Sequence, residues 1–71
     1  MTIECAMRFQ EPLNAPKRAH ALLTATEAAT AQALSGGFWF KTERSPTELL
    51  ATLEAAGLPF AAFESIDFKN I

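Results

Sequence analysis

The sequence predicts a small single-domain α+β protein in which two helices pack on a sheet of three or four strands. Three observations predict this fold: a strictly alternating N-terminal segment, an alanine-rich stretch that ends at two glycines, and a strand-helix-strand unit from Gly36 to Phe68. A chain of 71 residues is long enough for one domain only, so we place a single domain at residues 1–71. Its 49% hydrophobic and 20% charged residues are typical of a folded globular protein.

The first segment has the alternation of a half-buried strand. One side carries the hydrophobic residues Ile3, Cys5, Met7 and Phe9, and the other side carries Thr2, Glu4, Ala6 and Arg8. Residues 10–16 follow, and they contain two prolines, which cannot donate the hydrogen bonds of a sheet. We therefore expect the strand to end at Phe9.

The middle of the chain allows two interpretations. Residues Lys17 to Ser35 are alanine-rich and lead into Gly36-Gly37, which favours one long helix with a left-handed exit and with Glu27 on its solvent side. Residues 24–27, however, match a capping box that would begin a shorter helix at Ala25. Arg18 to Leu23 would then be free to form an additional strand. The element order is accordingly β-α-β-α-β or β-β-α-β-α-β.

The boundaries of the next two elements are marked by single residues. Phe38 to Thr42 is aromatic and β-prone, with Trp39 facing away from Phe38 and Phe40. Ser45-Pro46-Thr47-Glu48 supplies an N-cap serine, a proline at the first helical position and a glutamate three residues after the cap. Gly57-Leu58-Pro59 ends that helix.

The last segment, Phe60 to Lys69, reads as a strand with one irregularity. Glu64, Ile66 and Phe68 alternate, whereas Phe63 falls on the wrong side unless a bulge near Glu64 shifts the register. If both helices cover one face of the sheet, the other face stays open, with Trp39 on it. A ferredoxin-like arrangement is not predicted, because only the strand at residues 37–43 lies between the two helices.

The sequence contains no signature of catalysis or of cofactor binding. Cys5 is the only cysteine, so neither an internal disulfide nor a multi-cysteine zinc site can form. Cys5 and His20 are the only residues for a cysteine-histidine enzyme, and we expect the first to be buried and the second to be exposed on a helix. Gly36-Gly37 precedes a strand, which is the wrong geometry for a phosphate-binding loop. We expect no catalytic residues, no cofactor and no metal.

Charge and hydropathy narrow the expected partners. The net charge of −2 gives no general attraction to nucleic acid or to anionic lipid. The N-terminal segment lacks the continuous apolar run of a signal peptide, and no stretch has the length of a membrane span. We therefore expect a cytoplasmic protein that binds neither nucleic acid directly nor a membrane.

Acidic residues are concentrated near the C-terminus, because Ser45 to Phe68 contains four acids and no base. We predict a non-enzymatic interaction or inhibitor module that binds a protein with a basic surface. A homodimer is also compatible with this prediction. The predicted module is analogous to small acidic phage proteins that inhibit nucleic-acid-binding host complexes. The alternative is a metabolite-binding or enzymatic homo-oligomer with its pocket between subunits. The predicted partner-binding residues are Trp39, Glu48, Glu54, Glu64 and Asp67.

Overall fold

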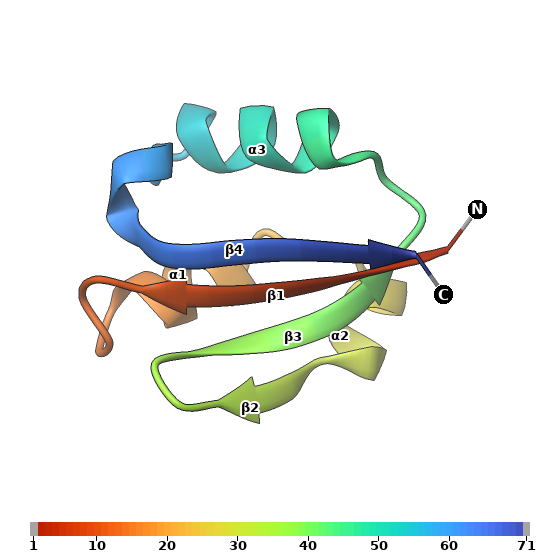
Figure 1. The fold of residues 1–71 in the computed structure, drawn as a ribbon, viewed down its shortest axis with the longest axis horizontal. Helices are drawn as coiled ribbons and strands as arrows, with labels where there is room; N and C mark the ends of the chain where they lie inside the picture. The colour runs from red at the N-terminus through yellow and green to blue at the C-terminus, as the bar shows by residue number, and fades with distance from the viewer. Residues whose placement is uncertain (1, 71) are drawn as a thin grey trace.

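The computed structural model describes residues 2–70, so Met1 and Ile71 of the predicted domain lie outside the described part. It confirms the fold class, a small α+β domain with a four-stranded sheet (Figure 1). The elements in chain order are β1 (Ile3–Phe9), α1 (Ala15–His20), α2 (Ala25–Thr30), β2 (Gln32–Leu34), β3 (Gly37–Thr42), α3 (Pro46–Ala55), the 3-10 helix η1 (Phe60–Ala62) and β4 (Phe63–Asn70).

The sheet has the strand order β2-β3-β1-β4, and all neighbouring strands are antiparallel. The central strand β1 therefore pairs with β3 on one side and with β4 on the other. If α1 and α2 are taken as one connection, this is the split β-α-β topology of ferredoxin-like domains. Our expectation against that topology was wrong, because β2 supplies the second strand between the helices.

The long helix expected from Lys17 to Ser35 does not form. The chain turns at residues 21–24 and divides into α1 and α2, and then extends into β2. The alternative interpretation was right about the capping box at Thr24 and wrong about a strand at Arg18 to Leu23, most of which is α1 or turn. Helix propensities differ by less than about 0.7 kcal/mol per residue among ordinary residues. Strand pairing of β2 with β3 and the burial of Glu27, described below, outweigh that preference.

Gly36 and Gly37 end no helix, which corrects a second expectation. Leu34 pairs with Gly37 across a two-residue loop, so the glycines belong to the hairpin between β2 and β3. Gly36 has a φ of 80°, which is the glycine position of a type II turn. Gly37 is held against β1, where a Cβ atom would lie 1.8 Å from the backbone oxygen of Met7. Only glycine fits there.

The C-terminal elements follow the predicted boundaries closely. Ser45 caps α3 by accepting a hydrogen bond from the backbone of Glu48 at 3.2 Å, and Gly57 leaves the helix with a φ of 85°. In the last strand, the register with β1 shifts where Arg8 faces Ser65 and Phe9 faces Phe63. Glu64 is the extra residue, which confirms the predicted bulge. Phe60 to Ala62, expected in this strand, form η1 instead.

The core lies on one face of the sheet. Alternate residues of β1 are buried and meet side chains of the helices, and Figure 1 shows α1 and α2 behind the sheet and α3 running along β4. The buried cluster is Cys5, Met7, Phe9, Ala15, Ala19, Phe38, Phe40, Leu49, Leu53, Leu58 and Phe63. The other face has half-buried residues such as Ala6 and Trp39 among charged ones. It is the open face that the sequence predicted, with more polar character.

Candidate functional site

The most distinctive polar group of the molecule is the carboxylate of Glu27. The sequence pattern places Glu27 in the first turn of α2, where it completes the capping box with Thr24. The backbone N–H of Thr24 donates to Oε1 of Glu27 at 2.9 Å, and the backbone N–H of Glu27 donates to Oγ1 of Thr24 at 3.2 Å. Our expectation of a solvent-facing Glu27 was wrong, because only 3% of the residue is exposed.

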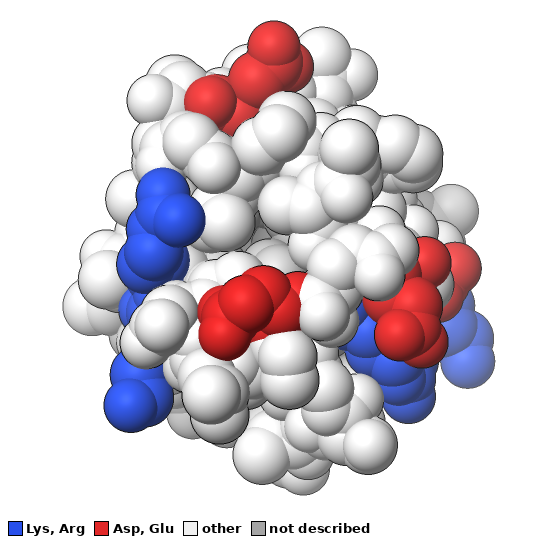
Figure 2. Space-filling view, turned by 90° about the vertical axis from the view of Figure 1, so that its left-hand side faces the viewer, with Lys and Arg blue, Asp and Glu red and all other residues white. Residues whose placement is uncertain are grey.

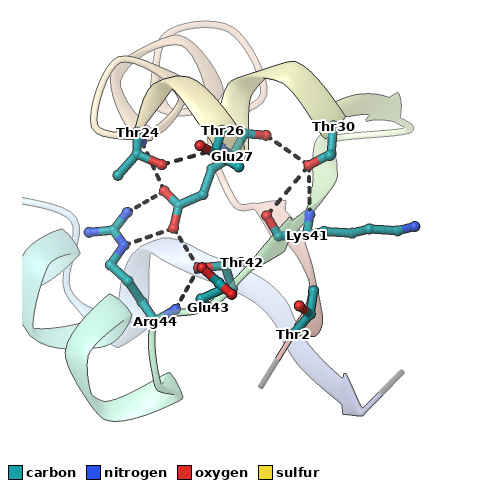
Figure 3. A pocket seen from close by; sticks show the side chains of 9 residues that line it. All are labelled: Thr2, Thr24, Thr26, Glu27, Thr30, Lys41, Thr42, Glu43 and Arg44. Atoms are coloured by element: carbon teal, nitrogen blue, oxygen red, sulfur yellow. Dashed lines mark hydrogen bonds and ion pairs between the residues drawn. The ribbon is translucent and has the colours of Figure 1, made fainter.

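Two residues at the end of β3 complete the surroundings of this carboxylate (Figure 3). Arg44 donates from Nε to Oε2 at 2.8 Å and from Nη2 to Oε1 at 2.6 Å, so its guanidinium binds both oxygens. Thr42 donates its hydroxyl to Oε2 at 2.5 Å and accepts a hydrogen bond from the backbone of Arg44 at 2.9 Å. The carboxylate thus accepts hydrogen bonds from three residues of two separate segments.

The hydrogen bonds hold Glu27 in its charged form. Burial of the carboxylate raises its pKa, but the hydrogen bonds from Arg44, Thr42 and the Thr24 backbone outweigh burial and lower the pKa to about 2. The same hydrogen bonds from Arg44 to Glu27 raise the pKa of the guanidinium. Both partners therefore stay ionised at neutral pH, and Glu27 has no proton to give to a substrate.

Thr30, at the other end of α2, makes a second connection to β3. Its hydroxyl accepts a hydrogen bond from the backbone N–H of Lys41 at 2.9 Å and donates to the backbone oxygen of Glu27 at 2.9 Å. Since α2 has only six residues, it depends on these contacts for its stability. The polar network is the attachment of α2 to the sheet.

A cleft of about 560 Å³ lies beside this network, between α2 and the end of β3. Figure 3 shows Thr2, Thr26 and Glu43 around it and the side chain of Lys41 pointing away from the ion pair. The polar groups at its base bond to one another rather than toward the opening. Within residues 2–70, no group of three or more histidine, cysteine, aspartate or glutamate side chains has the arrangement to hold a metal ion.

Cys5 and His20 have the environments that the sequence predicted. Cys5 is fully buried, and burial, with smaller contributions from the charges of Glu27 and Asp67, raises the pKa of its thiol to about 12. A thiol with this pKa is protonated at neutral pH and is a poor nucleophile. His20 is exposed, with its ring packed edge-on against Phe38 at a centroid distance of 5.6 Å.

The predicted partner-binding residues lie on three parts of the surface. Trp39 and Asp67 are on the open face of the sheet, where each is paired with Ala6 on β1. Glu48 and Glu54 are exposed in the first and last turns of α3, about 9 Å apart along the helix axis. Glu64 is exposed at the bulge of β4. The structure brings no more than two of the five residues together on any one of these parts.

Sequence reasoning missed a pair of exposed hydrophobic side chains. Leu13 and Phe60 are 72% and 71% exposed. Both lie at the same end of the sheet, because the backbone N–H of Gln10 donates to the oxygen of Ala62 at 2.9 Å and so joins the loop after β1 to η1. We call this end of the molecule, which carries Leu13 and Phe60, the apolar end. Their neighbours Pro12 and Pro59 were a signal that each side chain lies outside the strands.

Two acidic residues flank Phe60 of the apolar end along the chain. Glu54 precedes Phe60 at the end of α3, and Glu64 follows it at the start of β4. Figure 2 shows this end of the molecule, with separate acidic groups, uncharged side chains between them, and basic side chains on both sides of the view. The acidic residues do not merge into one continuous patch on this face.

Comparison with known proteins gives no family for the chain. We found no family model, no curated protein and no solved structure that matches it. A separate search of the described helices found none with the length and hydropathy needed to cross a membrane.

Proposed function

We propose that this chain is a non-enzymatic interaction module that binds a protein partner through the apolar end and the acids around it. The partner has an apolar pocket for Phe60 with basic side chains at its rim. The main support for this proposal is that Phe60 is 71% exposed. Large exposed aromatic side chains beside a polar rim are typical anchors of protein interfaces.

The surrounding charges support the same partner. Glu54 and Glu64 flank Phe60 in sequence, and both are exposed. The only ion pair among residues 2–70 is that between Glu27 and Arg44, so neither of these two acids is neutralised by a basic side chain there. They are available for a basic rim on the partner. Trp39, Glu48 and Asp67 lie on other parts of the surface and are not required for this contact.

Affinity capture from the native host with purified chain as bait tests the proposal. We expect capture of a protein partner, with affinity that falls as the salt concentration rises, because exposed charges are screened. Phe60→Ser should weaken binding by about tenfold or more, and Glu54→Gln with Glu64→Gln should remove most of the salt dependence. Glu43→Gln is the matched control, since Glu43 is an exposed acid on a distant loop.

Two results would contradict the proposal. One is the absence of any captured protein at micromolar bait. The other is a partner whose affinity is the same for Phe60→Ser as for the unchanged chain. Because Phe60 is exposed, its substitution should leave the circular dichroism spectrum and the unfolding free energy nearly unchanged, which separates lost binding from lost folding.

Metabolite binding within a single chain is the alternative, and the cleft of about 560 Å³ beside Glu27 is the observation in its favour. Binding there would be insensitive to Phe60→Ser and sensitive to substitutions such as Thr26→Val at the cleft. Titration of the chain with a metabolite library, followed by amide chemical shifts, distinguishes the two: shifts confined to the cleft would favour the alternative.

A further inference from the structure

The strand β4 has one side without a partner. It is the edge of the sheet beyond β1, and its eight residues make it much longer than β2, the three-residue strand at the opposite edge (Figure 1). Apart from the ladder that joins β4 to β1, the backbone hydrogen bonds of the described residues include none from residues 64–70. Edge strands of this length present unpaired backbone groups that can bind another strand.

The hydrogen bonds at the end of β1 show which residues of β4 face that edge. The backbone N–H of Phe9 donates to the oxygen of Gly36 just before β3, and that of Gln10 donates to the oxygen of Ala62 just before β4. Backbone direction alternates along a strand, so Arg8, Ala6 and Glu4 bond to β4. Their partners Ser65, Asp67 and Lys69 turn their backbone groups inward, and Ile66, Phe68 and Asn70 turn theirs outward.

An antiparallel second copy of β4 fits this edge in one favourable register. If Phe68 lies opposite Phe68 of the second copy, Asp67 of each chain lies opposite Lys69 of the other, twice by symmetry. Opposite charges directly across a strand pair stabilise it, and like charges destabilise it. The adjacent register, shifted by two residues, places the two Asp67 carboxylates opposite each other. The charges therefore select the register centred on Phe68.

The same register continues a row of charges on the open face. Lys41 on β3 pairs with Glu4 on β1, and Glu4 pairs with Lys69 on β4. Asp67 of the second copy extends this alternation of positive and negative residues by one strand. On the core face, the half-buried side chain of Phe68 gains cover from its symmetry mate.

The geometry points to a homodimer in which two copies of this chain join their β4 strands, centred on Phe68, into one continuous antiparallel sheet. The two-fold axis is perpendicular to the sheet, so the helices of both copies lie on the same side. The apolar end of each copy is outside this contact, and dimerisation leaves it free for a partner.

Hydrogen exchange gives the most direct test. In the monomer, the amides of Ser65, Asp67 and Lys69 are protected by β1, while those of Ile66 and Phe68 face water. The dimer should slow amide exchange at Ile66 and Phe68 by about tenfold or more. Dilution should restore fast exchange at these two residues and leave Ser65, Asp67 and Lys69 protected. Rapid exchange of Phe68 at millimolar concentration would overturn the proposal.

Charge exchange tests the register. Asp67→Lys and Lys69→Asp should each raise the dimer dissociation constant by about tenfold or more, because like charges then face each other twice. An equimolar mixture of the two variants should form a heterodimer, since opposite charges again face each other. Glu64→Lys is the matched control, because Glu64 lies on β4 outside the paired residues and should leave the dimer unchanged.

Sedimentation equilibrium measures the unchanged chain, the three variants and the mixture, with circular dichroism to confirm that each variant is folded. A chain that stays monomeric at millimolar concentration would refute the dimer. A dimer equally stable in all variants would refute this interface. None of these measurements involves another protein. A result that refutes the dimer therefore leaves the proposed partner binding at Phe60 untouched.

Discussion

The guanidinium of Arg44 holds both carboxylate oxygens of Glu27, at 2.6 and 2.8 Å, and so joins α2 to a loop 17 residues further along the chain. The side chain of Glu27 is 4% exposed and that of Arg44 is 20% exposed, so the pair is mostly shielded from water. A charged pair in such a place stabilises the fold only while both partners are present, because one partner left alone would be a buried, unpaired charge.

Glu27→Gln should therefore lower the free energy of unfolding by about 3 kcal/mol. The amide cannot accept the bidentate contact from Arg44 as a carboxylate does, and the guanidinium loses its counter-ion. Urea unfolding measures the change. Glu43→Gln, an exposed acid one position from Arg44, should change stability by less than about 0.5 kcal/mol. Thr42→Val is a milder variant, with an expected loss of about 1–2 kcal/mol. Equal stability of Glu27→Gln and the control would contradict the role we give the pair.

The pKa of Glu27 predicts how stability depends on pH. Because the folded state lowers that pKa from 4.5 to about 2, folding favours the ionised form. The resulting stabilisation is fully present above pH 4.5 and is lost as the pH falls from about 4.5 to about 2, amounting to about 3 kcal/mol. Urea midpoints measured across this range should fall steeply for the unchanged chain. Glu27→Gln should show a much flatter profile, and a profile as steep as that of the unchanged chain would assign the effect to other acids.

Cys5 should be almost unreactive in the folded protein. Its side chain is buried, and its pKa of about 12 keeps it protonated at neutral pH. We expect a thiol reagent to modify the native chain at least about a hundredfold more slowly than the chain in denaturing urea, because reaction requires opening of the core. Absorbance of the released chromophore follows both rates. Similar rates in the two conditions would show that Cys5 is accessible.

Gly37→Ala should be far more disruptive than Gly36→Ala. A methyl group at Gly37 would overlap the backbone oxygen of Met7 at 1.8 Å, so β3 would have to separate from β1. At Gly36 the space around a Cβ atom is open, and the cost comes only from its φ of 80°. We expect Gly37→Ala to lower the free energy of unfolding by about 3 kcal/mol or more, and Gly36→Ala by about 1 kcal/mol. Thermal or urea unfolding measures both changes. The opposite order would mean that the strands adjust at Gly37.

Local sequence signals predicted the elements that depend on near neighbours. Ser45 and Pro46 place the start of α3, Gly57 places its end, and the misplaced Phe63 indicates the bulge at Glu64. These features rest on backbone geometry within a few residues. The capping box of Thr24 and Glu27 was also visible, but alanine-rich surroundings favoured a longer helix. Propensity was the weaker signal, because it is worth only tenths of a kilocalorie per residue.

The candidate sites depended on contacts that no local pattern specifies. Phe60 resembles a strand residue in sequence, whereas the structure places it at the start of η1, where its side chain is exposed. Likewise, the outward direction of Phe68 follows from how β4 pairs with β1. The five predicted partner-binding residues stay predictions, and the structure distributes them over three parts of the surface.

The sequence alone therefore determined the fold class, the first and last strands, and the boundaries of α3, because alternation and caps act over a few residues. The tertiary structure decided that the alanine-rich segment would break, that Glu27 would be buried and that β2 would join the sheet. The physical reason is the cost of burying a carboxylate, which is met only where Arg44 and Thr42, brought close by the folded chain, supply hydrogen bonds.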